Sequence, residues 1–165
     1  MTDNTIRIGF TTQIKSPVSW LVRKLTKSQC SHAIFVYFDK DWQTDMVMEA
    51  ADVGFRLISL EKFKKSNEII ALIAPPVDID VGFKYVGLEY LGTMFDYFGL
   101  LGNGPILLGR WLKRKWHNPW NSPKSLFCSE AVVVALQKSG VPGADVLVPQ
   151  DTTPQDLMDF MQGKL

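Results

Sequence analysis

Short apolar runs separated by polar turns fill the first half of the chain. Alternation of apolar and polar residues at every second position is typical of strands that bury one face of a sheet. The pattern predicts strands over 6–10, 31–38, 46–50, 55–58 and 68–73. A polar stretch at 39–45 predicts a hairpin, which would make the two flanking strands antiparallel neighbours.

Helical patterns flank and follow these strands. They predict helices over 16–25, 81–91 and 125–136, a helical turn over 60–65, and a last helix that begins at Thr153. In the helix over 81–91, the apolar positions near helical spacing are Val81, Tyr85, Leu88 and Leu91. The predicted fold class is α+β in a single domain of 165 residues, with an antiparallel sheet and the helix of Cys128 packed against it.

Composition and charge narrow the classes of function. The 18 Lys and Arg residues nearly balance the 17 Asp and Glu residues, so the chain lacks the positive field that attracts nucleic acid. Two scattered cysteines and two histidines give no zinc-type ligand spacing, and no glycine-rich phosphate-binding loop stands between a strand and a helix. We therefore expect no nucleic acid, no metal and no cofactor.

The N-terminal residues and the lengths of the apolar runs bear on where in the cell the protein is expected. The first five residues are polar, and no basic start, apolar stretch and small-residue cleavage site follow one another there. The chain has no run of about 18 apolar residues, the length that a membrane-spanning helix needs. Without an export signal, we expect a cytoplasmic protein whose two cysteines are free thiols.

Cys128 lies in the first turn of the predicted helix over 125–136. Pro123 just upstream favours a helix start there, and Gly140 marks its end. Free backbone N–H groups at a helix start and the positive end of the helix dipole both favour a thiolate. One interpretation is a reactive thiol, and the other is a small buried apolar residue, the usual role of a free cysteine. Cys30 has no helix start beside it, and we interpret it as structural.

His32 and Glu49 supply the other two groups of a Cys–His–acid site. The only other histidine is His117, and Glu49 stands among apolar residues, where a carboxylate usually needs a partner. A helix terminus typically supplies about 0.3–1 kcal/mol to an exposed charge, less than the ~1.36 kcal/mol of one pKa unit. A protonated His32 would therefore supply most of the stabilisation of a Cys128 thiolate. The alternatives are a core histidine and a solvated acid at a strand end.

In the order of its histidine, acid and cysteine motifs and in their local sequence, the chain resembles the circularly permuted papain-like (NlpC-type) cysteine enzymes, in particular the YiiX/YaeF-like group. The motifs that carry the resemblance are Ser31-His32-Ala33, Met48-Glu49-Ala50, Leu91-Gly92-Thr93-Met94-Phe95-Asp96, Phe127-Cys128-Ser129-Glu130 and Thr153-Pro154-Gln155-Asp156-Leu157. In this group the histidine precedes the cysteine, the reverse of the order in other papain-like enzymes. Phe95 stands where the group usually has tyrosine, a departure that bears on the substrate.

The resemblance implies a papain-like fold in permuted order and a thiol hydrolase that cleaves an amide or peptide bond, with cell-wall peptides as one substrate. It implies that Cys128 is the nucleophile, His32 the base and Glu49 the orienting acid, and a bacterial or phage source. The residues in and near these motifs that would contact the substrate are Phe127, Ser129, Phe95, Asp96, Trp111 and Trp116. Two alternatives stay open: a lipid acyl hydrolase or acyltransferase on the same triad, and a non-catalytic binding domain that keeps the fold.

The stretch 99–120 differs in composition from the rest of the chain. It combines glycines, basic residues and tryptophans, and residues 99–125 contain no acid. We predict a basic, tryptophan-rich insertion or mobile flap there. Its basic charge and aromatic rings would give weak contact with an anionic membrane or cell-wall polymer through 110–120. The alternative is an ordinary helix with inward tryptophans and charges that face solvent.

Overall fold

The sheet and the helices of the protein are seen in a computed structural model that describes residues 5–14, 19–20, 23–24, 28–51, 54–93 and 128–164. Five strands form one antiparallel sheet in the order β4-β3-β2-β1-β5. The strands are β1 Arg7–Gln13, β2 His32–Asp39, β3 Thr44–Ala51, β4 Gly54–Ser59 and β5 Asn67–Ile73. The α+β class and the predicted hairpin between β2 and β3 are therefore confirmed.

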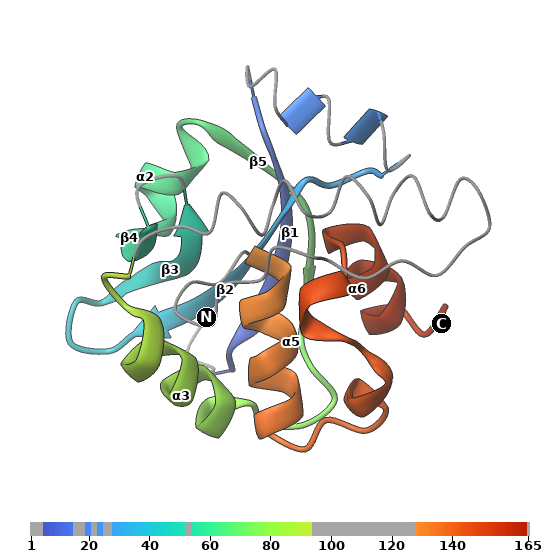
Figure 1. The fold of residues 1–165 in the computed structure, drawn as a ribbon. Helices are drawn as coiled ribbons and strands as arrows, with labels where there is room; N and C mark the ends of the chain where they lie inside the picture. The colour runs from blue at the N-terminus through green and yellow to red at the C-terminus, as the bar shows by residue number, and fades with distance from the viewer. Residues whose placement is uncertain are drawn as a thin grey trace.

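Helices cover the sheet and join its edge strands. They are α2 Leu60–Lys64, α3 Asp80–Tyr90, α5 Cys128–Lys138 and α6 Pro154–Met161, with short 3-10 turns η1 Ala144–Val146 and η2 Pro149–Asp151. In Figure 1, α5 lies in front of the sheet between α3 and α6. The α6 start is the predicted one, because Thr153 and Asp156 form a reciprocal capping box with Pro154 in the first turn.

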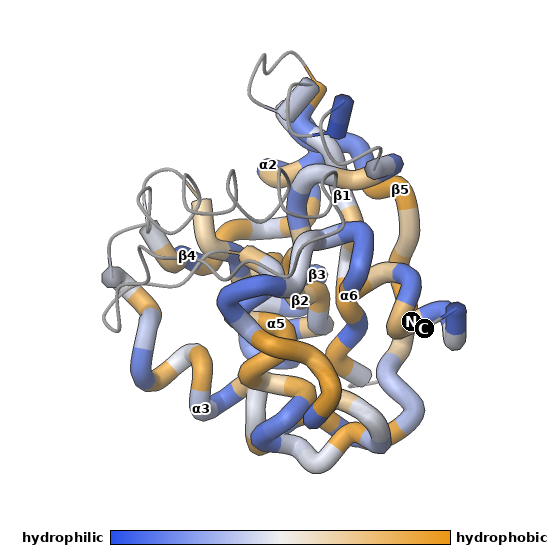
Figure 2. The backbone as a smooth tube through the Cα atoms, turned by 45° about the vertical axis from the view of Figure 1, so that its right-hand side comes forward, coloured by the Kyte–Doolittle hydropathy of each residue, from blue (hydrophilic) through white to orange (hydrophobic). Residues whose placement is uncertain are grey.

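The two faces of the sheet bury cores of different size. Ala33 and Phe35 of β2 belong to the larger core, which the strands share with α3, α5 and α6. Ile34 and Val36 point the other way, into a small core closed by Leu60 and Phe63 of α2. Hydrophobic residues fill the middle of α5, which is buried in the larger core (Figure 2).

Helix α3 confirms the predicted element but presents a different face to the core. Val81 and Leu88 are 69% and 89% exposed, whereas Gly82 and Val86 are buried. The apolar spacing therefore identified the helix, whereas two of its apolar positions face solvent. A Cβ on Gly82 would lie 1.9 Å from the carbonyl oxygen of Ala135, so the missing side chain lets α3 approach the backbone of α5.

The remaining predicted elements are described in part or lie outside the described residues. Of the helix expected over 16–25, Ser19, Trp20, Arg23 and Lys24 are described, and they are helical. The stretch 99–120, predicted to be an insertion or flap, lies outside the described residues. Among those that the structure describes, no helix is long and apolar enough to cross a membrane.

Candidate functional site

The site lies at one end of the sheet, where β2 and β3 are no longer paired. Their ladder runs from Asp39–Thr44 to Phe35–Met48 and stops before His32 and Glu49 are reached. Glu49 still pairs with Arg56 of β4, and His32 pairs with Thr11 of β1. The two polar side chains therefore come from neighbouring strands at the point where the pairing between these strands has ended.

His32 and Glu49 meet directly, as their positions on adjacent strands predicted. Nε2 of His32 donates to Oε2 of Glu49 at 2.8 Å. The other carboxylate oxygen, Oε1, accepts from Nε and Nη2 of Arg56 at 3.0 and 2.8 Å. Glu49 is only 4% exposed. Its charge is stable in this buried place because both oxygens have charged hydrogen-bond donors.

Cys128 stands at the first described turn of α5 and is 8% exposed. The thiol interacts with His32 through charge and a side-chain hydrogen bond. Because Nε2 is engaged by Glu49, Nδ1 is the ring nitrogen left for the sulfur. The backbone N–H groups of Ala33 and Ser129 also donate to the sulfur. The sulfur thus has three donors, which come from β2 and from α5.

The acidities of the three groups shift in the directions expected for an ion pair. Burial alone would raise the pKa of the Cys128 thiol, but the positive charge of His32 and the hydrogen bonds lower it. Burial alone would lower the pKa of His32, but Cys128 and Glu49 together raise it from 6.5 to about 10. Burial likewise opposes ionisation of Glu49, yet His32 and Arg56 lower its pKa. These three directions favour a thiolate, an imidazolium and a carboxylate side by side.

Cys30 is the second thiol of the larger core, and the charges that act on it, those of Cys128 and Asp159, are negative. It is fully buried, and the Ser28 hydroxyl lies 3.8 Å from its sulfur. Burial raises the pKa of Cys30 to about 11. Both cysteines are free. The structure therefore agrees with the interpretation of Cys30 as a structural residue.

Two polar side chains of the motifs hold the backbone around the site. The Ser129 hydroxyl donates to the carbonyl oxygen of Thr152 at 2.6 Å and so anchors the start of α5. Gln155 of α6 accepts hydrogen bonds from the Ser28 hydroxyl at 3.1 Å and the Gln29 N–H at 2.9 Å. These bonds hold the segment that leads into β2, and with it the backbone of His32. Glu130 lies in the first turn of α5, as expected for an acid at a helix start.

Arg56 is the residue that sequence reasoning missed. The pairing of Ala51 with Gly54 leaves only two residues between β3 and β4. A tight hairpin centred there pairs Glu49 with Arg56, so the register alone would have placed an arginine opposite the acid. The other predicted substrate contacts, Phe127, Phe95, Asp96, Trp111 and Trp116, lie outside the described residues.

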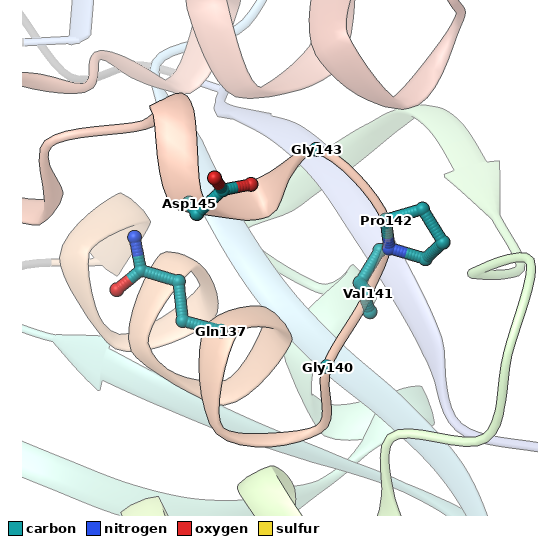
Figure 3. Close-up of a pocket in the computed structure, with 6 residues that line it drawn as sticks. All are labelled: Gln137, Gly140, Val141, Pro142, Gly143 and Asp145. Carbon is teal, nitrogen blue, oxygen red and sulfur yellow. The ribbon is translucent and has the colours of Figure 1, made fainter.

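A hollow elsewhere on the surface does not belong to this site. It lies at the C-terminal end of α5, where Gln137 and Asp145 stand across from Val141 and Pro142 (Figure 3). The Gln137 amide already donates to the carbonyl oxygens of Ala144 and Leu147, at 2.9 and 2.8 Å. No group of three His, Cys, Asp or Glu side chains that could hold a metal ion occurs among the residues described.

Comparison with known proteins adds no assignment to this geometry. No protein-family model matches the chain, and no curated protein sequence matches it either. The arguments about function therefore rest on the site itself.

Proposed function

We propose that the protein is a thiol hydrolase that cleaves an amide or peptide bond with Cys128 as nucleophile, His32 as acid and base, and Glu49 as orienting acid. The single observation that supports this best is the position of His32 between the Cys128 thiol and the Glu49 carboxylate. A nucleophile, a base and a group that orients the base are the parts that covalent catalysis by a thiol needs. We further propose a papain-like fold in circularly permuted order, since the histidine strand precedes the cysteine helix.

In the proposed reaction, the Cys128 thiolate attacks the carbonyl carbon and forms a C–S bond. The carbonyl oxygen becomes an oxyanion, and the backbone N–H of Cys128 would help to stabilise it. The imidazolium of His32 gives its proton to the leaving amine as the C–N bond breaks, which leaves a thioester. Water then attacks the thioester while neutral His32 accepts a proton, and the thiolate is restored. Glu49 stays ionised throughout and holds the ring in place.

A chromogenic substrate series tests both the chemistry and the class of substrate. Purified protein would be assayed with a peptide amide, a cell-wall muropeptide and a short-chain acyl ester. We expect turnover of an amide, with a thioester trapped on Cys128 by mass spectrometry. Cys128→Ala should abolish turnover, whereas Cys30→Ala serves as the matched control and should keep it.

The outcomes separate the competing functions. Turnover of the acyl ester alone would replace the amide substrate with a lipid acyl group on the same three residues. If wild type neither turns over any substrate nor reacts faster than Cys128→Ala with a thiol-directed probe near neutral pH, the chain is a non-catalytic domain. That last result would overturn the proposal.

A further inference from the structure

We propose that Arg56 is a positioning residue that sets the charge and orientation of Glu49 and, through Glu49, the basicity of His32. The inference rests on the proposed thiol chemistry, because it concerns the same site. Arg56 itself contacts Glu49, and no interaction with Cys128 or His32 is seen for it in the described part of the chain. Its effect on the sulfur must therefore pass through two other side chains.

The hydrogen bonds divide the carboxylate between its two partners. Both donors of Arg56 converge on Oε1, and Nε2 of His32 occupies Oε2. Rotation of the carboxylate about its last bond would break bonds to the guanidinium and to the imidazole together. Arg56 thus restricts Glu49 to the orientation in which Oε2 faces the ring.

Arg56 also keeps Glu49 ionised where burial would protonate it. The charged groups that act on Glu49 are His32 from β2 and Arg56 from β4, and beyond His32 lies Cys128 from α5. The four groups form a row of alternating sign, from thiolate to imidazolium to carboxylate to guanidinium. Without the guanidinium, His32 would be the one cationic neighbour left to Glu49 among the described residues, and His32 loses its charge when it donates its proton.

The sheet register makes this contact a built feature of the fold. Glu49 and Arg56 are direct cross-strand partners in β3 and β4. A second arginine–carboxylate pair on the same sheet differs in its distance, in the number of contacts and in its exposure. Arg7 reaches Asp45 at 3.9 Å through one nitrogen, and the Asp45 side chain is 38% exposed, compared with 4% for Glu49. Arg7 is therefore a matched control for the loss of one arginine charge.

The test measures the rate at which iodoacetamide alkylates Cys128 as a function of pH, which requires no substrate. All variants carry Cys30→Ala so that Cys128 is the only thiol. Arg56→Met should raise the pKa of the Glu49 carboxyl, because burial then acts with fewer opposing groups. Protonated Glu49 no longer supports the imidazolium, so the acidic limb of the profile should move up by about 1 pH unit. Arg56→Lys should restore part of that shift, and Arg7→Met should give none.

A double substitution tests whether Arg56 acts through Glu49. In a protein that already carries Glu49→Gln, the charge on which Arg56 acts is gone. Arg56→Met should then shift the acidic limb by less than roughly a third of the shift it causes as a single substitution. Arg56→Gln, which keeps a donor but loses the charge, decides the matter if Arg56→Met does not fold. If an Arg56 variant folds and its pH profile of alkylation superimposes on that of wild type, the inference is overturned and the proposed function is left intact. A wild-type profile that titrates like an ordinary thiol instead overturns the proposed function.

Discussion

Cys30 and Cys128 lie in the same hydrophobic core, yet their surroundings give them opposite acidities. Burial raises the pKa of Cys30 to about 11. Burial acts on Cys128 in the same direction, but there the charge of His32 and the hydrogen bonds outweigh it and lower the pKa. Burial alone therefore does not decide whether a thiol is inert. The local arrangement of positive charge and N–H donors decides it.

The backbone around the two thiols differs. Cys128 stands at the first described turn of α5, and the N–H groups of Ala33 and Ser129 act on its sulfur. Cys30 precedes β2, and its own N–H donates to the Ser28 hydroxyl at 3.1 Å. His32 is only two residues from Cys30, but its ring lies between Cys128 and Glu49. Closeness in sequence to the histidine gives Cys30 no share in the ion pair.

The largest expected effect is selective labelling of the two thiols in the wild-type protein. With a pKa of about 11, Cys30 is about one part in 10⁴ thiolate at pH 7, and its sulfur is also buried. A thiolate of low pKa is less nucleophilic, which offsets part of the difference. We expect iodoacetamide to modify Cys128 at least ~10³-fold faster at pH 7. Peptide mapping by mass spectrometry over time measures this ratio, and equal labelling would contradict the contrast.

The second largest effect should follow from His32→Gln. The neutral amide can still donate to Glu49, but it carries no charge to offset the burial of the Cys128 sulfur. The pKa of Cys128 should rise, so its alkylation at pH 6 should slow by about 100-fold. The difference should shrink as the pH rises, because the variant thiol then ionises as well. A rate at pH 6 within threefold of wild type would show that N–H donors alone hold the thiolate.

Strand periodicity and helix-start signals in the sequence predicted most of the contrast between Cys30 and Cys128. Alternation in β2 and the proline before α5 located His32 and Cys128, and the apolar setting of Glu49 indicated that it needs a partner. The sequence could not show how far the ladder between β2 and β3 extends. The end of that pairing is a tertiary property, and it is what leaves His32 and Glu49 facing each other.

Two failures of prediction have different physical causes. Arg56 was missed because its role depends on register, which the short connection between β3 and β4 fixes, rather than on any pattern in its own strand. The buried face of α3 could not be read from the apolar spacing, because glycine scores as neither apolar nor polar. Gly82 marks the close approach to α5, whereas Val81 and Leu88, the residues that periodicity favours, are exposed.

Glu49→Gln should give a smaller effect than loss of His32 and should reveal how the ion pair is maintained. The variant loses the charge and the acceptor that help to raise the pKa of His32 to about 10, so that pKa should fall. The imidazolium is then lost at lower pH, and the alkaline limb of kcat/KM should move down. At neutral pH we expect about a 10-fold fall in kcat, measured on the amide substrate that the proposed substrate series identifies. Unchanged turnover in a folded variant would remove Glu49 from the mechanism.

The smallest effect should come from Cys30→Ala. Cys30 is protonated near neutral pH, because its pKa of about 11 lies far above it, and an uncharged thiol exerts little electrostatic effect on Cys128. The alkylation rate of Cys128 at pH 7 should therefore change by less than about twofold. Loss of the buried sulfur should instead lower the free energy of unfolding by about 1 kcal/mol, measured by urea denaturation. A 10-fold change in Cys128 reactivity without a loss of stability would mean that the two thiols act as one chemical unit, and the contrast between them would fail.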